Sequence, residues 1–225
     1  MMNKSAVQNW ARKLVEANPD NLNDPDDYFK HIGQVYDLAE GVVKNILARY
    51  PNIPLIGEEV SLASGLHDIG RPLQKDQIFH ELRGANYTEQ EGLEKEVAGS
   101  LRDIYRIAQM FRSHGFAYEY WQDSECAESR KEFEPLEASL LVPRTWQESI
   151  VTYSDLTSQD GERIKVKDRI NELFNRHKND PKYQNGIVVR AATAGLNRIL
   201  ELAERVEALE QGKLTEQDIV RYGFL

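Results

Sequence analysis

Apolar residues that recur every three or four positions constrain this chain more than any other feature. Between Asp24 and Pro51 they form a single stripe, and side chains at this spacing share one face of an α-helix. Asp24 or Asp26 is expected to cap the start of that helix, and Pro51 to close its end. The same periodicity predicts further helices over residues 1–20, 57–69, 88–115, 145–159, 165–179, 187–212 and 215–223. Alternating runs typical of strands are nearly absent, so the sequence predicts an all-α fold, a helical bundle.

Length, charge and cysteine usage limit the classes of protein and partner. The 225 residues carry a net charge of -9 at pH 7 and a single cysteine, Cys126. An acidic surface argues against long nucleic acid and membrane surfaces as partners. One cysteine excludes an intramolecular disulfide, which fits a cytoplasmic location. No apolar run reaches the length of a membrane span, and the N-terminus lacks the apolar core of a signal peptide.

We expect one domain over residues 1–225. The polar segment 119–135 is expected to be a surface loop or lid, with disorder as the alternative. It is not expected to be a domain boundary, because the apolar helices on both sides need one another. The core is expected at about 26–180. The C-terminal helices, over 185–225, are expected to pack on that core or to form a homodimer contact.

His67 and Asp68 stand side by side where a helix is expected to stop. Neighbouring side chains on a helix diverge by about 100°, so the pair can bind one ion only in a cavity that both side chains wrap. Gly70 and Pro72 indicate that the helix ends within a turn. A helix C-terminus carries partial negative charge, which favours a bound cation. The alternative is a capping histidine beside a solvated aspartate.

Two further residues are candidates for the same site. Asp155 is expected on the inward side of an apolar helix, where an unpaired carboxylate is costly, so its partner is either an arginine or a metal held by histidines. His31 is in phase with Tyr28 and Val35 on the apolar face of its helix, where a core histidine bonded to a carbonyl is the alternative. Imidazole and carboxylate ligands together suit Mn, Fe, Co, Ni or Zn better than Ca or Mg.

Taken in order, these residues resemble the H…HD…D pattern of the HD-domain superfamily of metal-dependent phosphohydrolases. The stretch "GLHDIG" is similar to the form common in its HDIG subgroup, and "VTYSDLTSQDGERI" resembles the segment around the last aspartate. The resemblance covers roughly residues 26–180. It implies a helical bundle with a central metal site, in which His31, His67, Asp68 and Asp155 hold one divalent transition-metal ion (Mn, Fe, Co, Ni or Zn). It also implies hydrolysis of a small phosphorylated metabolite, with a nucleotide or cyclic nucleotide as the favoured substrate.

Some members of that superfamily bind a second ion through two histidines that lie between the HD pair and the last aspartate. By this resemblance, Asp68 bridges to the second ion, and His80 and His114 supply the histidine ligands. His80 lies in "FHELRGANY", which is similar to the histidine-then-Gly-Ala segment of those members. This chain departs from them in having Glu81 where relatives often have proline, and in having one histidine at position 114 rather than a pair. His177 is outside the pattern and is expected at the surface.

The expected reaction is attack of a metal-activated water on phosphorus, with basic side chains neutralising the phosphate. Asp68 is therefore assigned to catalysis as well as to metal binding. Arg71 is the first candidate for phosphate contact, because its planar fork can bind phosphate bidentately; Arg83 and Arg112 are second choices. Asp76 resembles by position an acid that some HD nucleotidases use to position water or protonate the leaving group, with a solvated loop carboxylate as the alternative.

Other readings stay open for the basic segment and for the whole protein. Residues 163–169 are either a solvated helix face or the rim of a phosphate-binding mouth. The same set of histidines and aspartates also resembles the di-iron HD-type oxygenases. A non-catalytic HD module that binds a ligand is the third possibility, and the intact ligand set argues against it.

Overall fold

The computed structural model describes residues 3–90, 101–177 and 186–224, and helices dominate it. The α-helices are α1 (Lys4–Ala17), α2 (Pro25–Arg49), α3 (Gly57–Leu66), α4 (His80–Gln90), α5 (Leu101–Arg112), α6 (Ala117–Gln122), α7 (Ala127–Arg130), α8 (Trp146–Thr157), α9 (Val166–His177), α10 (Ile187–Glu210) and α11 (Glu216–Tyr222). Short 3-10 turns are η1 (Arg71–Leu73), η3 (Ser124–Cys126), η4 (Lys131–Phe133) and η5 (Ala138–Leu141). The prediction of an all-α bundle is confirmed.

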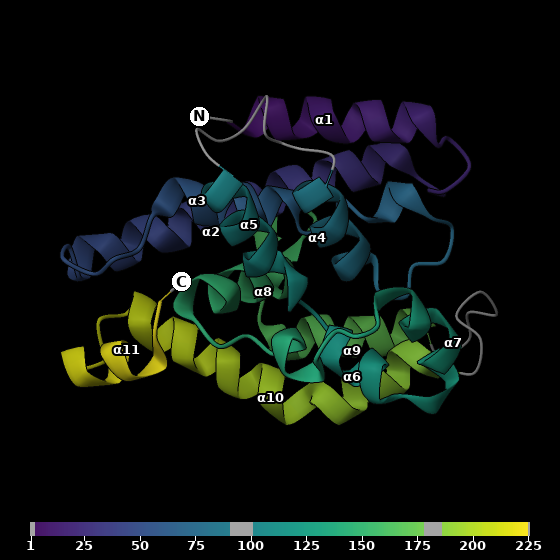
Figure 1. The fold of residues 1–225 in the computed structure, drawn as a ribbon. Helices are drawn as coiled ribbons and strands as arrows, with labels where there is room; N and C mark the ends of the chain where they lie inside the picture. The colour runs from purple at the N-terminus through teal and green to yellow at the C-terminus, as the bar shows by residue number, and fades with distance from the viewer. Residues whose placement is uncertain (1–2, 91–100, 178–185, 225) are drawn as a thin grey trace.

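The helices stack so that α3 and α8 lie inside the molecule (Figure 1). α1 and α2 run along one side, and α10 runs along the opposite side. α3 packs against α1, α2, α5 and α8, and its residues from Glu59 to Leu66 are all buried. In α8 every residue except Asp155 is buried. Asp155 is thus the one residue of this helix that is partly exposed, and its side chain lines a cavity.

Local signals define the helix starts. The Asp24 side chain accepts a hydrogen bond of 3.0 Å from the backbone N–H of Asp27, and Pro25 occupies the first position of α2. Of the two caps expected for this helix, Asp24 is the one used. α8 begins with a capping box between Thr145 and Glu148, in which each side chain meets the backbone of the other.

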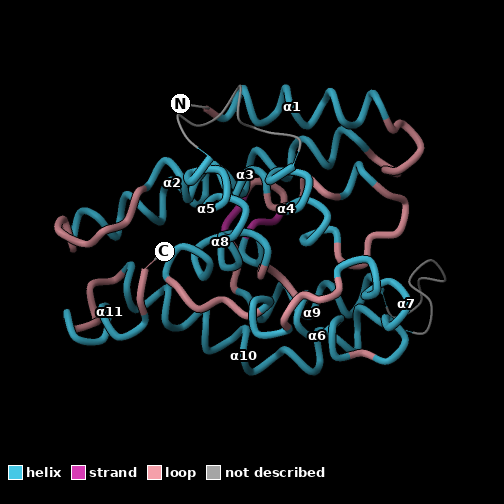
Figure 2. Tube along the Cα trace, in the orientation of Figure 1, coloured by secondary structure: helices cyan, strands magenta, loops and turns pink. Residues whose placement is uncertain are grey.

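The only strands in the described residues are β1 (Ser158–Gln159) and β2 (Glu162–Arg163), an antiparallel pair that Figure 2 draws in magenta behind α8. Asp160 and Gly161 form the turn between them with positive φ angles of 51° and 88°. This hairpin turns the chain sharply after the helix that carries Asp155. It thereby directs α9 back across the molecule.

Two expectations about the elements were wrong. The helix expected over 57–69 ends at Leu66. The helix expected over 88–115, with or without a break, is present where the chain is described, in the end of α4 and in α5, and residues 91–100 lie outside the described part. The segment 119–135 is not a loop: it forms short helical turns, because Trp121, Cys126 and Phe133 are buried among them. Turns of three to six residues are too short to show a helical period in the sequence.

The buried apolar residues form one cluster that reaches from α1 to α11. It includes the apolar stripe of α10, with Ile199, Leu202 and Val206. That stripe packs on the chain's own core, and the homodimer stays a prediction. Among the helices of residues 3–90, 101–177 and 186–224, none combines the length and apolar composition that a membrane span requires.

Candidate metal centre

The six side chains predicted as metal ligands come from five different helices or helix ends. His31 lies on α2, His67 and Asp68 follow α3, His80 begins α4, His114 follows α5, and Asp155 lies on α8. The structure brings all six together around Asp68. They form two groups, one on each oxygen of its carboxylate.

The first group consists of His31, His67, Asp155 and the Oδ2 atom of Asp68. The two Nε2 atoms of His31 and His67 are 3.2 Å apart, and Asp155 Oδ1 lies 3.3 and 3.4 Å from them. Asp68 Oδ2 is 3.8 Å from the His31 nitrogen and 3.5 Å from the His67 nitrogen. Ligands about 2.1 Å from a common ion lie roughly 3.0–3.5 Å from one another. These atoms therefore have nearly the spacing of one coordination shell, and the group could hold a metal ion.

The second group meets the other oxygen of Asp68. His80 Nε2 lies 2.8 Å and His114 Nε2 lies 3.7 Å from Asp68 Oδ1. Within the described part of the chain, neither Asp68 Oδ1 nor His80 Nε2 takes part in a hydrogen bond, although both are buried. Asp68 Oδ1 and His80 Nε2 are therefore close to each other but not oriented for a hydrogen bond. This is the arrangement expected of two ligands directed at the same cation. The arrangement suits a carboxylate that bridges two ions.

Three of the histidines are oriented by the same backbone contact. In each, Nδ1 lies within hydrogen-bond distance of the carbonyl oxygen three residues earlier: His67 to Ser64 (2.6 Å), His80 to Gln77 (2.8 Å) and His114 to Phe111 (2.6 Å). A carbonyl can only accept, so Nδ1 carries the proton. The Nε2 lone pair then faces the cluster, as metal-binding histidines require.

Gly70 and Gly84 allow α4 to approach the end of α3. A Cβ atom on Gly70 would lie 1.9 Å from the carbonyl oxygen of His80, and one on Gly84 would lie 2.9 Å from the backbone nitrogen of Gly70. Gly70 has a φ of -76°, which any residue adopts. The helix does end within a turn of the His67-Asp68 pair, as expected, but a glycine is required at this position because two backbones touch there, beside His67 and His80.

Burial and neighbouring charges compete in the cluster. Burial raises the pKa of Asp68, but Arg71, His67 and His80 outweigh it and hold this pKa well below its usual value. Burial also raises the pKa of Asp155, and His67 and His31 lower it further than burial raises it. The cluster therefore keeps both carboxylates ionised.

His114 carries the compensating proton when no metal is bound. Burial lowers its pKa, but contact with Asp68 and the charges of Glu81 and Asp155 raise it to about 9. A metal ion that binds to His114 has to displace this proton. Without a metal, this proton offsets part of the negative charge of the carboxylates.

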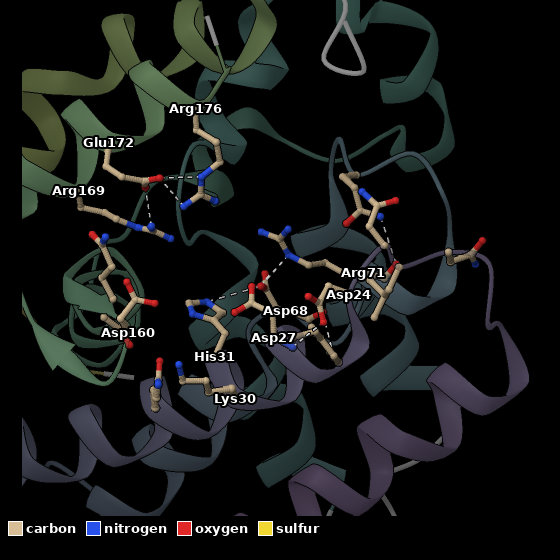
Figure 3. Close-up of a pocket in the computed structure, with 18 residues that line it drawn as sticks. Asp24, Asp27, Lys30, His31, Asp68, Arg71, Asp160, Arg169, Glu172 and Arg176 are labelled. Atoms are coloured by element: carbon tan, nitrogen blue, oxygen red, sulfur yellow. Dashed lines mark hydrogen bonds and ion pairs between the residues drawn. The ribbon is translucent and has the colours of Figure 1, made fainter. Parts of the chain in front are cut away.

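Two cavities open beside the cluster, with volumes of about 400 and 140 Å³. Both are lined by His31, Arg71, Gln77, Arg169 and Arg176. Polar side chains line most of the larger cavity, among them Asp24, Lys30 and Asp160 (Figure 3). The smaller cavity is lined by His80, His114 and Asp155 together with apolar side chains such as Phe116 and Leu173. The metal-ligand candidates therefore lie where a polar space meets a smaller, more apolar one.

Three arginines lie around this junction. Arg71 Nε is 2.6 Å from Asp68 Oδ2. Glu172 binds Arg169 at 2.7 Å and the Nε atom of Arg176 at 2.7 Å. Figure 3 shows this triad on one side of His31 and Arg71 on the other. The site therefore combines a set of metal-ligand candidates with guanidinium groups that can bind phosphate oxygens.

One of these arginines, Arg169, was anticipated from the sequence, and Arg176 was not. Arg169 belongs to the basic segment for which a phosphate-binding rim was one of two readings, and it lines both cavities. Arg176 was missed. It lies seven residues further on, which is two helical turns, so the spacing alone places both side chains on one face of α9.

The structure places three other candidates away from the cavities. Arg83 donates to the carbonyl oxygens of Asp76 and Ile78 (2.8 and 2.7 Å) and pairs with Glu132 (3.0 Å). Arg83 therefore fastens the loop before α4, and it does not line either cavity. The guanidinium of Arg83 is thus engaged by Glu132 and two backbone carbonyls, and its contact with substrate stays a prediction.

Arg112 and Asp76 are also directed elsewhere. Arg112 pairs with Glu89 at 2.5 Å. Asp76 Oδ1 accepts a hydrogen bond of 3.0 Å from the backbone N–H of Ile78. Neither lines the two cavities, and the substrate role of Arg112 and the catalytic role of Asp76 stay predictions. Sequence distance from the HD pair does not determine where a side chain points.

Two residues of the smaller cavity were not expected there. His177 was expected at the surface, but it is buried and lines this cavity. Glu81 is also buried in its wall, next to His80 and His114. The sequence contained a signal for Glu81, because "HE" at 80–81 repeats the histidine–carboxylate pairing of "HD" at 67–68.

Comparisons with protein-family models, curated proteins and solved structures found no match to this chain. The case for a metal centre therefore rests on the geometry of the chain's own residues: buried His, Asp and Glu side chains that could hold a metal ion.

Proposed function

We propose that this protein is a metal-dependent phosphohydrolase that cleaves a small phosphoester. One observation carries the proposal: the ligand atoms of six side chains converge around Asp68, and three arginines surround the cavity beside them. The resemblance of the H…HD…D order to the HD-domain superfamily supports the same reading. Metal ions and guanidinium groups are the two means by which phosphoryl-transfer sites stabilise negative charge.

The residues present fit a divalent transition metal. Asp68 Oδ1 and His80 Nε2 are buried without a hydrogen bond among the described residues. A buried polar atom of this kind destabilises the fold unless a bound ligand interacts with it. Histidine with carboxylate is a donor set for Mn, Fe, Co, Ni or Zn. His31, His67, Asp68 and Asp155 would hold the first ion, and His80 and His114 would contribute to a second.

When bound, the metal would lower the pKa of a water molecule so that hydroxide is available near neutral pH. The protein's own part is to bind and orient the phosphate. Arg71, Arg169 and Arg176 would bind its non-reacting oxygens. Glu172 holds two of these guanidinium groups in place, which reduces the entropy lost when a phosphate binds.

The cavities indicate the size and chemistry of the substrate. A volume of about 400 Å³ beside the metal-ligand candidates is in the range of small-molecule sites. Its polar lining and the local arginines suit an anionic metabolite, and the net charge of -9 disfavours long nucleic acid. A nucleotide or a cyclic nucleotide has the required charge, and we take these as the first substrates to test.

The test is phosphate release by purified protein that has been stripped of metal and reloaded with Mn, Fe, Co, Ni, Zn or Mg. The panel contains nucleoside monophosphates, cyclic nucleotides and sugar phosphates. Asp68→Asn is expected to lower kcat/KM by at least about a hundredfold, because it removes the carboxylate shared by both groups. Asp37→Asn is the matched control: Asp37 lies on α2 with His31 but is exposed and pairs with Lys4.

A second variant separates phosphate binding from metal binding. Arg176→Ala is expected to raise KM by about tenfold or more, the value of a hydrogen bond to a charged group, while the metal content stays at the wild-type level. Absence of phosphate release from every ester with every metal would contradict the proposal. Oxygen consumption by iron-loaded protein would favour an oxygenase instead, and a tightly bound nucleotide without turnover would favour a binding module.

A further inference from the structure

The carboxylate of Glu81 is buried at the edge of the metal-ligand cluster. Its side chain is 2% exposed, and Oε2 accepts no hydrogen bond within the described residues. The His80 Nδ1 atom lies 3.5 Å from it, but the proton of that nitrogen is directed to the Gln77 carbonyl oxygen. A buried carboxylate oxygen without such a partner is unfavourable unless a cation is present.

Glu81 points to the same space as two histidines. It lines the smaller cavity with His80 and His114. One ligand atom from each of these three residues lies within 4.8 Å of the other two. The space that these atoms surround is therefore small enough for one ion.

The turn before α4 forces this arrangement. Phe79 has a φ of 62°, a conformation that bulky residues rarely adopt. It is fully buried, with the rings of Trp121 and Phe133 at 5.8 and 5.7 Å. The aromatic packing holds this strained turn, and α4 begins directly after it. His80 and Glu81 consequently enter the cluster together, as His67 and Asp68 do at the end of α3.

We propose that Glu81 is a ligand of a second divalent ion, together with His80, His114 and Asp68. The inference rests on the metal centre of the proposed function and adds to it a ligand outside the H…HD…D pattern. Each ion would then have two imidazoles and two carboxylates, with Asp68 shared between the two. Equal donor sets favour the same metal in both sites, and the added carboxylate shifts the preference toward Mn or Fe over Zn.

The test measures metal binding, not activity. Metal-stripped wild-type protein is titrated with Mn²⁺, with equilibrium dialysis and metal analysis for the stoichiometry and calorimetry for the affinities. Wild-type protein is expected to bind two ions. Glu81→Gln is expected to keep the first ion and to weaken the second by at least about tenfold, because even supporting residues of metal sites contribute that much.

Two variants control for indirect effects. Glu89→Gln removes a carboxylate from the same helix, but one that pairs with Arg112 away from both cavities, and it is expected to bind two ions with unchanged affinity. Asp155→Asn is expected to weaken the other ion. The thermal unfolding of Glu81→Gln without metal is expected to stay close to that of wild type, because the amide keeps the size and shape of the carboxylate.

The outcomes separate this inference from the proposed function. Two ions with unchanged affinity in Glu81→Gln would overturn the role of Glu81 and leave the metal centre intact. One ion in wild-type protein would also overturn it, while the first site and its chemistry would stand. If no ion binds to wild-type protein, both the inference and the proposed function fail.

Discussion

At the scale of single residues, the cluster depends on side chains whose direction is set by their own backbone. The carbonyl oxygens of Ser64, Gln77 and Phe111 hold the Nδ1 atoms of the three histidines that follow them. Their Nε2 atoms are thereby presented before any ion binds. Preorganisation of this kind avoids the cost of ordering ligands at the moment of binding.

The glycine after the HD pair allows a test at this scale. Gly70→Ala is expected to destabilise the protein by at least about 2 kcal/mol, because the added Cβ overlaps the backbone of His80. Urea unfolding measures the difference. Gly41→Ala on α2 is the control: a Cβ there meets nothing within 4 Å, so this change should stabilise the helix by about 0.5–1 kcal/mol. Equal effects of the two substitutions would contradict the close approach of α3 and α4.

At the scale of elements, the end of α10 is tied to α2 and to the hairpin by one carboxylate. Glu210 accepts hydrogen bonds from Asn45 at 2.8 Å and from Arg163 at 2.9 Å. Arg163 also donates from Nε to the hydroxyl of Tyr153 on α8, at 3.2 Å. A single ion pair between a buried carboxylate and a partly exposed guanidinium therefore connects four elements.

This ion pair predicts a pH-dependent contribution to stability. Burial raises the pKa of Glu210, but Arg163 and Asn45 outweigh it, so that this pKa is lowered in the folded protein. A lowered pKa stabilises the fold above the unfolded value of about 4.3 and loses that effect as the pH falls through the folded pKa. Wild-type protein should therefore exceed Glu210→Gln by about 1–3 kcal/mol at pH 7, and by progressively less below pH of about 4.

Urea unfolding at pH 7, 5 and 3.5 measures this difference. Glu204→Gln serves as the control, since Glu204 is exposed on the same helix and should show almost no difference at any pH. A gap between wild type and Glu210→Gln that stays constant down to the lowest pH would argue against the ion pair as its source.

At the scale of the whole molecule, the metal-ligand cluster joins helices that lie far apart in the sequence. α2 and α8 contribute His31 and Asp155, and α4 contributes His80. An ion bound to these side chains links elements that separate when the protein unfolds. Metal binding and folding are therefore expected to be coupled.

Thermal unfolding should reflect this coupling. Free Mn²⁺ or Co²⁺ at about a hundred times its Kd is expected to stabilise the fold by about 2.7 kcal/mol per site, and EDTA should reverse the rise in Tm. Asp68→Asn should lose most of the rise, because it affects both sites. Asp37→Asn should retain it. A Tm that is the same in EDTA and in saturating Mn²⁺ would rule out the coupling.

Most of the helices could be predicted from the sequence because they depend on local interactions. The stripe on α2 and its cap at Asp24 depend on residues a few positions apart. Helix periodicity, caps and turns are of this kind, which is why the all-α bundle followed from them. The segment 119–135 was misread because its turns are held by contacts to residues elsewhere, such as Phe79 against Trp121.

By itself, the sequence determined the helices and, through the order of His31, His67, Asp68 and Asp155, a set of candidates for one metal site. Only the tertiary structure decided which side chains meet. It turned Arg83 toward Glu132, directed Arg176 to the cavities and placed Glu81 beside His80 and His114. The physical reason is that a helix fixes the spacing of its side chains locally, whereas the partner of each side chain lies on another element whose position depends on the packing of the whole core.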